Sequence, residues 1–126
     1  MTENEIGTII VETAIHVHRV LGPGLLDSVY EIVMAKLLEE KGLKVQQQVR
    51  VSIVFEDLHF DEAFRADMIV EGKVMVELKS VEKQNPVHPK QLLTYLKLSG
   101  MKLGYLLNFN EVLMKDGINR IINGIL

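Results

Sequence analysis

The chain has 126 residues, of which 48% are hydrophobic and 25% charged, and its formal net charge is −3. These values are typical of one ordinary globular domain spanning residues 1–126, and they argue against a disordered chain and against a protein that coats nucleic acid by charge alone. Cysteine is absent, which excludes disulfides, thiolate metal sites and cysteine nucleophiles.

Two helices are predicted in the first third of the chain. Apolar residues recur at helical spacing from Glu5 to Leu21, and Gly22-Pro23-Gly24 ends the run. A second helix is predicted from about Leu26 to Lys41. Its predicted buried residues are Val29, Val33, Leu37 and Leu38. The first helix carries more Ile and Val residues than one face buries, which favours a homodimer.

Three strands are predicted to follow. From Val45 to Phe55 apolar residues recur at a period of two, which is typical of a half-buried strand. The segments Phe64–Val70 and Val74–Ser80 flank a short turn centred on Gly72, and this arrangement predicts a β-hairpin. The second and third strands are therefore expected to be neighbours in the sheet.

A third helix and a further strand complete the predicted core. The segment from Lys90 to Leu98 has helical spacing, and Gly100 ends it. Lys102 to Phe109 is apolar enough for a buried strand, while Gly117 to Ile122 is a short amphipathic segment of no assigned type. The predicted fold class is α/β (α+β), with a mixed four-stranded sheet flanked by helices.

The predicted hairpin brings charged side chains together. Because side chains alternate along a strand, Glu77 and Lys79 share a face, and Asp67 lies opposite or nearly opposite Glu77. Directly opposite residues have Cβ atoms about 5 Å apart, and two carboxylates that close repel unless a cation neutralises them. Magnesium, which prefers oxygen ligands, suits this pair. The alternative is an ordinary sheet face with cross-strand ion pairs.

These residues form recognisable motifs. Asp67 and Glu77-Leu78-Lys79 resemble the Asp…Glu-x-Lys signature of PD-(D/E)XK nucleases, which lies on such a hairpin in a restriction-endonuclease-like αβββαβ core. Gln91 and Tyr95, one helical turn apart, resemble the Gln-x-x-x-Tyr motif of the RecB-like branch.

A further stretch, Gly24 to Tyr30, resembles the motif that names the GxxExxY family, and Gly104 with Asn108-Phe109 also matches that family. The glutamate of the motif is replaced here by Asp27. In related nucleases an acid on this helix completes the metal shell, so Asp27 is a candidate ligand, with Glu31 as its substitute. The competing interpretation is that Asp27 interacts with the helix dipole.

The resemblance implies a nuclease that hydrolyses phosphodiester bonds with Mg²⁺, or with Mn²⁺ as a substitute. It implies that Asp67, Glu77 and the backbone carbonyl of Leu78 hold the metal and that Lys79 orients the attacking water. Gln91 and Tyr95 would position Lys79, the phosphate or a metal ligand. We expect a nucleic-acid partner, DNA before RNA. The alternative is a catalytically weak or inactive nuclease-fold module that binds nucleic acid or regulates as a homodimer.

Charge and hydropathy patterning add two expectations. Residues 73–126 carry a net charge of +4 against −7 for residues 1–72, so the second half is the part that could face phosphates. No apolar run approaches the roughly 20 residues that a bilayer span needs, and no membrane association is expected. The first five residues carry two acids and no basic segment, which points to the cytoplasm.

Overall fold

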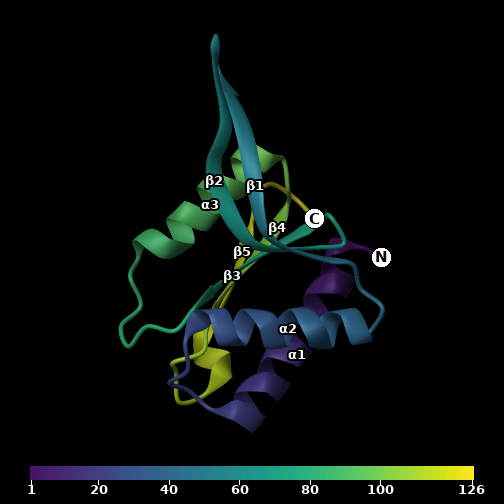
Figure 1. Cartoon of the computed structure of the whole chain (residues 1–126), viewed down its shortest axis with the longest axis vertical. Coiled ribbons are helices and arrows are strands. Elements are labelled where there is room, and N and C mark those ends of the chain that lie inside the picture. The colour runs from purple at the N-terminus through teal and green to yellow at the C-terminus, as the bar shows by residue number, and fades with distance from the viewer.

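The computed structural model describes residues 1–126 as one five-stranded sheet flanked by three α-helices (Figure 1). In chain order the elements are α1 (Glu3–Leu21), α2 (Asp27–Glu40), β1 (Val45–Phe55), β2 (Leu58–Val70), β3 (Val74–Lys79), α3 (Val87–Ser99), β4 (Leu103–Asn108), the 3-10 helix η1 (Met114–Gly117) and β5 (Ile118–Ile122). The predicted α+β class with a restriction-endonuclease-like core is confirmed.

The sheet has five strands where the sequence predicted four. The additional strand is β5, which pairs antiparallel with β4 at the sheet edge. Strand order in the sheet follows chain order from β1 to β5, and only β3 and β4 are parallel. Two parallel neighbours need a crossover connection, and α3 supplies it.

Two hydrophobic cores cover the two faces of the sheet. The larger one packs α1 and α2 against one face, and its strand residues include Val74, Val76 and Leu78. The smaller one packs α3 against the other face, and Met75 belongs to it. This division follows the predicted alternation along β3, which turns Glu77 toward the side of α3.

The buried stripe of α2 is offset from the predicted one. Its buried residues are Tyr30, Met34, Ala35 and Leu38. Val29 is 38% exposed, so the prediction of Val29 as a core residue was wrong. The hydroxyl of Tyr30 donates to the Gly22 carbonyl at 2.6 Å, and its ring stacks on Phe109 at a centroid distance of 4.3 Å. These contacts turn Tyr30 inward and its neighbour Val29 outward.

Strand β2 begins six residues earlier than predicted, at Leu58. Residues 58–60 pair with the end of β1, and Glu56 and Asp57 make the turn between the two strands. The resulting β1–β2 hairpin protrudes from the body of the molecule at the top of Figure 1.

Candidate active site

Strands β2 and β3 stop pairing where the two predicted acids lie. Their ladder runs from Val70 opposite Val74 to Met68 opposite Val76 and ends there. The next position would pair Asp67 with Glu77. Instead, the Leu78 N–H donates to Asp67 Oδ2 at 3.0 Å, and the Asp67 N–H lies 3.4 Å from Glu77 Oε1. Each carboxylate thus bonds to the backbone of the opposite strand, and the two lie side by side in the gap.

Strand β1 is also interrupted beside Asp67, at Gln48. This residue has a φ of 51°, in the left-handed region, and it forms no pair with β2 although both of its neighbours do. The Gln48 side-chain amide donates to Glu31 Oε1 at 2.7 Å and lies 3.4 Å from Asp67 Oδ1. Gln47 donates to the other oxygen of Glu31 at 3.0 Å. A polar network therefore runs from α2 through β1 to Asp67.

The pair of carboxylates is electrostatically strained. Burial, followed by the hydrogen bond and the charge of Asp67, raises the pKa of Glu77 to about 9. The positive charge of Lys79 acts in the opposite direction but is a smaller influence. Without a cation between the two groups, Glu77 therefore keeps its proton at neutral pH.

Lys79 is half-buried at the end of β3. Its backbone carbonyl accepts a hydrogen bond from the Phe109 N–H at 3.0 Å, which ties the strand end to β4. Just beyond it, the Asn108 side chain accepts from the Val81 N–H at 3.1 Å and donates to the Val81 carbonyl at 3.0 Å. The pKa of His88 is lowered by burial and by the nearby Lys79. The segment from Lys79 to Val81 is thus fastened to the end of β4.

On α3, Tyr95 is half-buried and Gln91 is exposed. The ring of Tyr95 stacks on Phe64 with centroids 3.9 Å apart and planes 2° from parallel. Burial, and then the charges of Glu77 and Asp67, raise the pKa of Tyr95, while a hydrogen bond with Gln91 partly offsets the rise. The structure therefore brings the Gln91–Tyr95 pair to the side of the site occupied by both carboxylates.

The two candidate acids of α2 are placed differently. Asp27 is exposed at the start of the helix and accepts a hydrogen bond from the Ser28 N–H at 2.9 Å. Glu31 is half-buried and is linked to Asp67 through Gln48. No three His, Cys, Asp or Glu side chains are grouped closely enough to hold a metal ion by themselves.

The donors at the gap nevertheless fit a divalent cation. In a strand, the N–H and C=O of one residue face the same neighbouring strand, so the Leu78 carbonyl faces β2 as its N–H does. Together with Asp67 and Glu77 it offers three oxygen donors, the ligand type that Mg²⁺ and Mn²⁺ prefer. A cation would also counteract the burial and the charge of Asp67 that raise the pKa of Glu77.

Sequence reasoning missed the two glutamines that hold Glu31. Gln46-Gln47-Gln48 is an unusual polar run inside a strand, and this was the available signal. The left-handed backbone at Gln48 has no sequence marker, because glycine is absent there. Tyr30, by contrast, has a structural role, since it fastens the Gly22 to Leu25 turn through its hydroxyl.

The fold and the paired carboxylates at the open end of its central hairpin define a restriction-endonuclease-like protein. A family model of the PD-(D/E)XK nuclease superfamily matches residues 4–121, and the chain belongs to that superfamily. Comparison with curated proteins gave no match. Membership indicates nuclease-type function and a nucleic-acid substrate, and nucleases of this superfamily generally use divalent metal ions. None of the helices has the length and apolar character needed to cross a membrane.

Proposed function

We propose that the protein is a Mg²⁺-dependent nuclease, with Mn²⁺ as a substitute, that hydrolyses phosphodiester bonds at the Asp67–Glu77 gap. The observation that carries this proposal is the buried Glu77 carboxyl, whose pKa is raised to about 9 beside Asp67. A fold tolerates such a pair at a cost in stability, which supports a functional role.

Asp67, Glu77 and the Leu78 carbonyl would hold the metal. When bound, the cation would polarise the phosphate and lower the pKa of a water molecule. Asp67 and Glu77 are kept in position by the backbone N–H groups of the opposite strands, so the site is organised before a ligand enters. Glu31 steadies Asp67 through Gln48, and Asp27 remains a candidate for an additional ligand at the exposed start of α2.

Lys79 is the group proposed to act on the attacking water. Its ammonium lies near Glu77 and donates hydrogen bonds only, so it can orient the water oxygen and stabilise charge that develops on the phosphate. Tyr95 and Gln91 would position Lys79, the phosphate or a ligating carboxylate from α3. This role is supported by the effect of both carboxylates on the pKa of Tyr95.

We also propose the finer assignments that the motifs imply. The Gly24 to Tyr30 stretch supports the GxxExxY family, and Gln91 with Tyr95 supports the RecB-like branch. From that likeness we take DNA rather than RNA as the substrate. Parallel assays on DNA and RNA, linear and closed, test the substrate.

Metal binding is the direct test. We expect isothermal titration of Mn²⁺ at neutral pH and low salt to give one or two ions per chain, and Glu77→Ala to abolish binding. The matched control is Glu82→Ala, which removes an exposed acid from the loop after β3. Circular dichroism verifies that each variant is folded. Equal binding by the wild-type protein and Glu77→Ala would overturn the proposed site.

A second candidate function is a nuclease-fold module that binds nucleic acid or regulates as a homodimer, with little turnover. The observation that favours it is the absence of a third acid grouped with Asp67 and Glu77. Under this alternative the protein binds nucleic acid in an electrophoretic shift assay without metal, and Mn²⁺ adds no cleavage. Metal-dependent cleavage that Glu77→Ala abolishes would rule it out.

A further inference from the structure

The tip of the β1–β2 hairpin carries an apolar face that nothing in the chain covers. Residues paired across the hairpin share a face, and Ile53 pairs with Phe60 while Phe55 pairs with Leu58. Exposed fractions are 63% for Phe55, 59% for Leu58 and 46% for Phe60. The same hairpin is covered by α3 only near its base, where Phe64 lies in the smaller core. Its outer end is therefore an uncovered apolar knob.

The knob is also acidic. Glu56 and Asp57 form its turn, and Asp61 follows on β2. The nearest basic side chains along the hairpin are Arg50 and Arg65, which lie further from the turn. Both form ion pairs with Glu62, at 3.6 and 2.7 Å. The tip thus combines exposed aromatic and aliphatic side chains with uncompensated negative charge.

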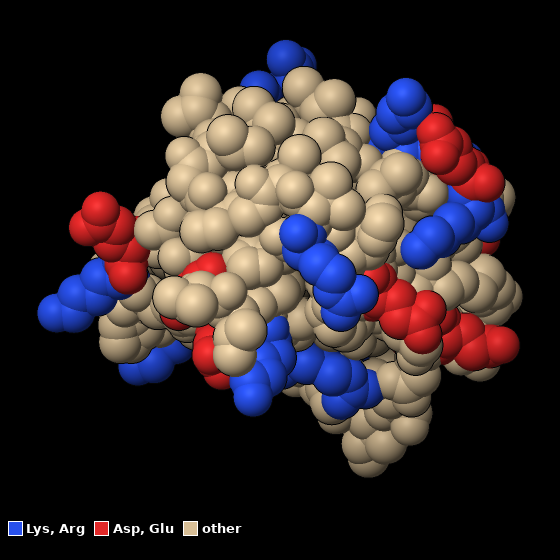
Figure 2. All heavy atoms as spheres, turned by 90° about the horizontal axis from the view of Figure 1, so that it is seen from below, with Lys and Arg blue, Asp and Glu red and all other residues tan.

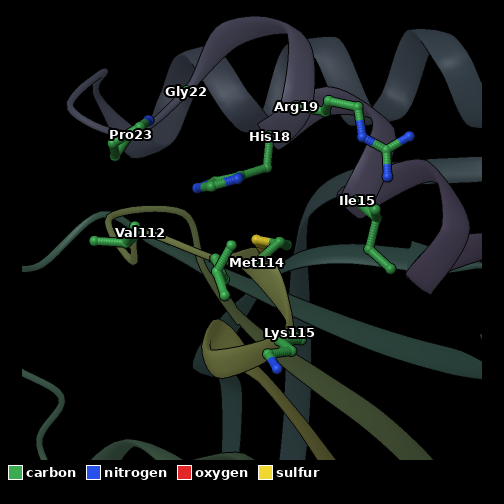
Figure 3. A pocket seen from close by; sticks show the side chains of 9 residues that line it. Ile15, His18, Arg19, Gly22, Pro23, Val112, Met114 and Lys115 are labelled. Atoms are coloured by element: carbon green, nitrogen blue, oxygen red, sulfur yellow. The ribbon is translucent and has the colours of Figure 1, made fainter.

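A cavity whose charged side chains are basic lies between the end of α1 and the segment around η1 (Figure 3). Its volume is about 410 Å³. Apolar lining comes from Ile15, Val112, Leu113 and Met114, and the charged side chains that line it are basic, Arg19 and Lys115. His18 reaches across from α1, and its Nε2 donates to the Glu111 carbonyl at 2.7 Å.

The mouth of this cavity is apolar as well. Val112 is 87% exposed and Leu113 is 52% exposed. Figure 2 views this end of the molecule and shows a broad area without charged side chains, with lysine, arginine and acidic side chains around it. Exposed apolar side chains such as Val112 and Leu113, next to the basic Arg19 and Lys115, are typical of an interaction surface.

The knob and the cavity complement each other in charge and both are apolar, but they lie at opposite ends of the molecule (Figure 1). They cannot meet within one molecule. We propose that the hairpin tip of one copy fills the Arg19–Lys115 cavity of a second copy, and that the second copy returns the same contact. Two such reciprocal contacts, one from each copy, define a pair with two-fold symmetry.

In this pair Phe55 or Leu58 enters the cavity, and Glu56 and Asp57 face Arg19 and Lys115. The apolar contact supplies affinity, and the charges fix which surfaces meet. None of these residues belongs to the Asp67–Glu77 site. Loss of the pair therefore leaves Mn²⁺ binding at Glu77 intact, and the two proposals fail separately.

Charge reversal followed by mixing tests the contact. The tip variant is Glu56→Lys with Asp57→Lys, and the cavity variant is Arg19→Glu with Lys115→Glu. We expect sedimentation velocity to show a wild-type dimer at about 100 µM. Each variant alone should be monomeric, because like charges then meet at both contacts. An equimolar mixture should restore a dimer, since opposite charges meet only in the mixed pair.

The control is Lys36→Glu with Lys97→Glu, which reverses two exposed charges on the outer faces of α2 and α3 and should leave the dimer unchanged. Circular dichroism confirms that all variants are folded. A wild-type protein that stays monomeric at about 100 µM overturns the proposal. So do dimers that survive both reversals, a mixture that stays monomeric, or open assemblies larger than a dimer.

Discussion

The two halves of the β2–β3 hairpin belong to the same strands but differ in how their backbone groups are hydrogen-bonded. In the inner half, from Val70 and Val74 to Met68 and Val76, every position is paired and buried. In the outer half the ladder ends, and carboxylates take over the backbone N–H groups. No buried side-chain N or O atom is left without a partner. The strands can therefore part without leaving buried polar side chains unpaired, and the two candidate acids lie where they part.

The largest expected effect tests the chemical role of the outer half. Lys79→Ala should lower the rate of DNA cleavage by about 100-fold or more, because the ammonium that orients water and meets developing charge is lost. Single-turnover cleavage with Mg²⁺ measures it. Lys83→Ala, in the exposed loop beyond, is the matched control. Equal rates for the wild-type protein and Lys79→Ala would contradict the assignment.

A substitution in the inner half should instead lower the free energy of unfolding. Met68 is fully buried in the larger core, and Met68→Ala should reduce the free energy of unfolding by about 3 kcal/mol through lost burial and a cavity. Urea unfolding followed by circular dichroism measures the change. A loss below about 1 kcal/mol would mean that the inner half is packed less tightly than its burial indicates.

The carboxylate pair should make the metal-free protein less stable as pH rises. Glu77 keeps its proton in the folded state up to a pKa of about 9, whereas in the unfolded chain it ionises near 4.5. Folded molecules therefore bind more protons in this window, and stability falls as pH rises from about 4.5 to about 9. Glu77→Gln removes this loss.

In EDTA, Glu77→Gln should be more stable than the wild-type protein at pH 8, on the order of 2 kcal/mol, and nearly equal to it at pH 4.5. Thermal unfolding at both pH values measures the difference. The same gain at both pH values would show that the variant acts through packing and that ionisation of Glu77 is not the cause.

The smallest expected effect concerns the hydrogen bonds by which Gln48 on β1 links Asp67 to Glu31. Gln48→Ala should weaken Mn²⁺ affinity about tenfold, because Asp67 loses its link to Glu31. Gln46→Ala, an exposed neighbour on the same strand, should leave the affinity unchanged. If both variants bind Mn²⁺ like the wild-type protein, the glutamine network serves only to fasten α2 to the sheet.

Much of the inner architecture could be predicted from the sequence. Strand β1 has its predicted bounds, Val45 to Phe55, because alternation over eleven residues is a strong signal. The segment from Leu58 to Ala63 was left unassigned, and pairing of Leu58 to Phe60 with β1 extends β2 into it. β5 was left unassigned because five residues at a sheet edge carry too little pattern.

The two acids of the candidate site could be predicted from the sequence, but the glutamine network that holds Asp67 could not. Spacing placed Asp67 opposite Glu77, and the structure brings these two together. The contribution of Gln48 depends on one left-handed residue and on how α2 packs over β1, which are tertiary facts that periodicity does not encode. The offset of α2 arose in the same way, since the hydroxyl of Tyr30 selects the buried face.

The parallel pairing of β3 with β4 has a consequence for the newly made chain. Glu77 and Lys79 lie on β3, whose second neighbour is β4, residues 103–108, made about 25 residues later. While a ribosome still covers those residues, β3 lacks one side of its sheet and Lys79 lacks the anchor that Phe109 provides. Completion of the sheet around β3 thus waits for residues 103–109, so a nascent polypeptide that still lacks them has no assembled Asp67–Glu77 pair at a finished sheet.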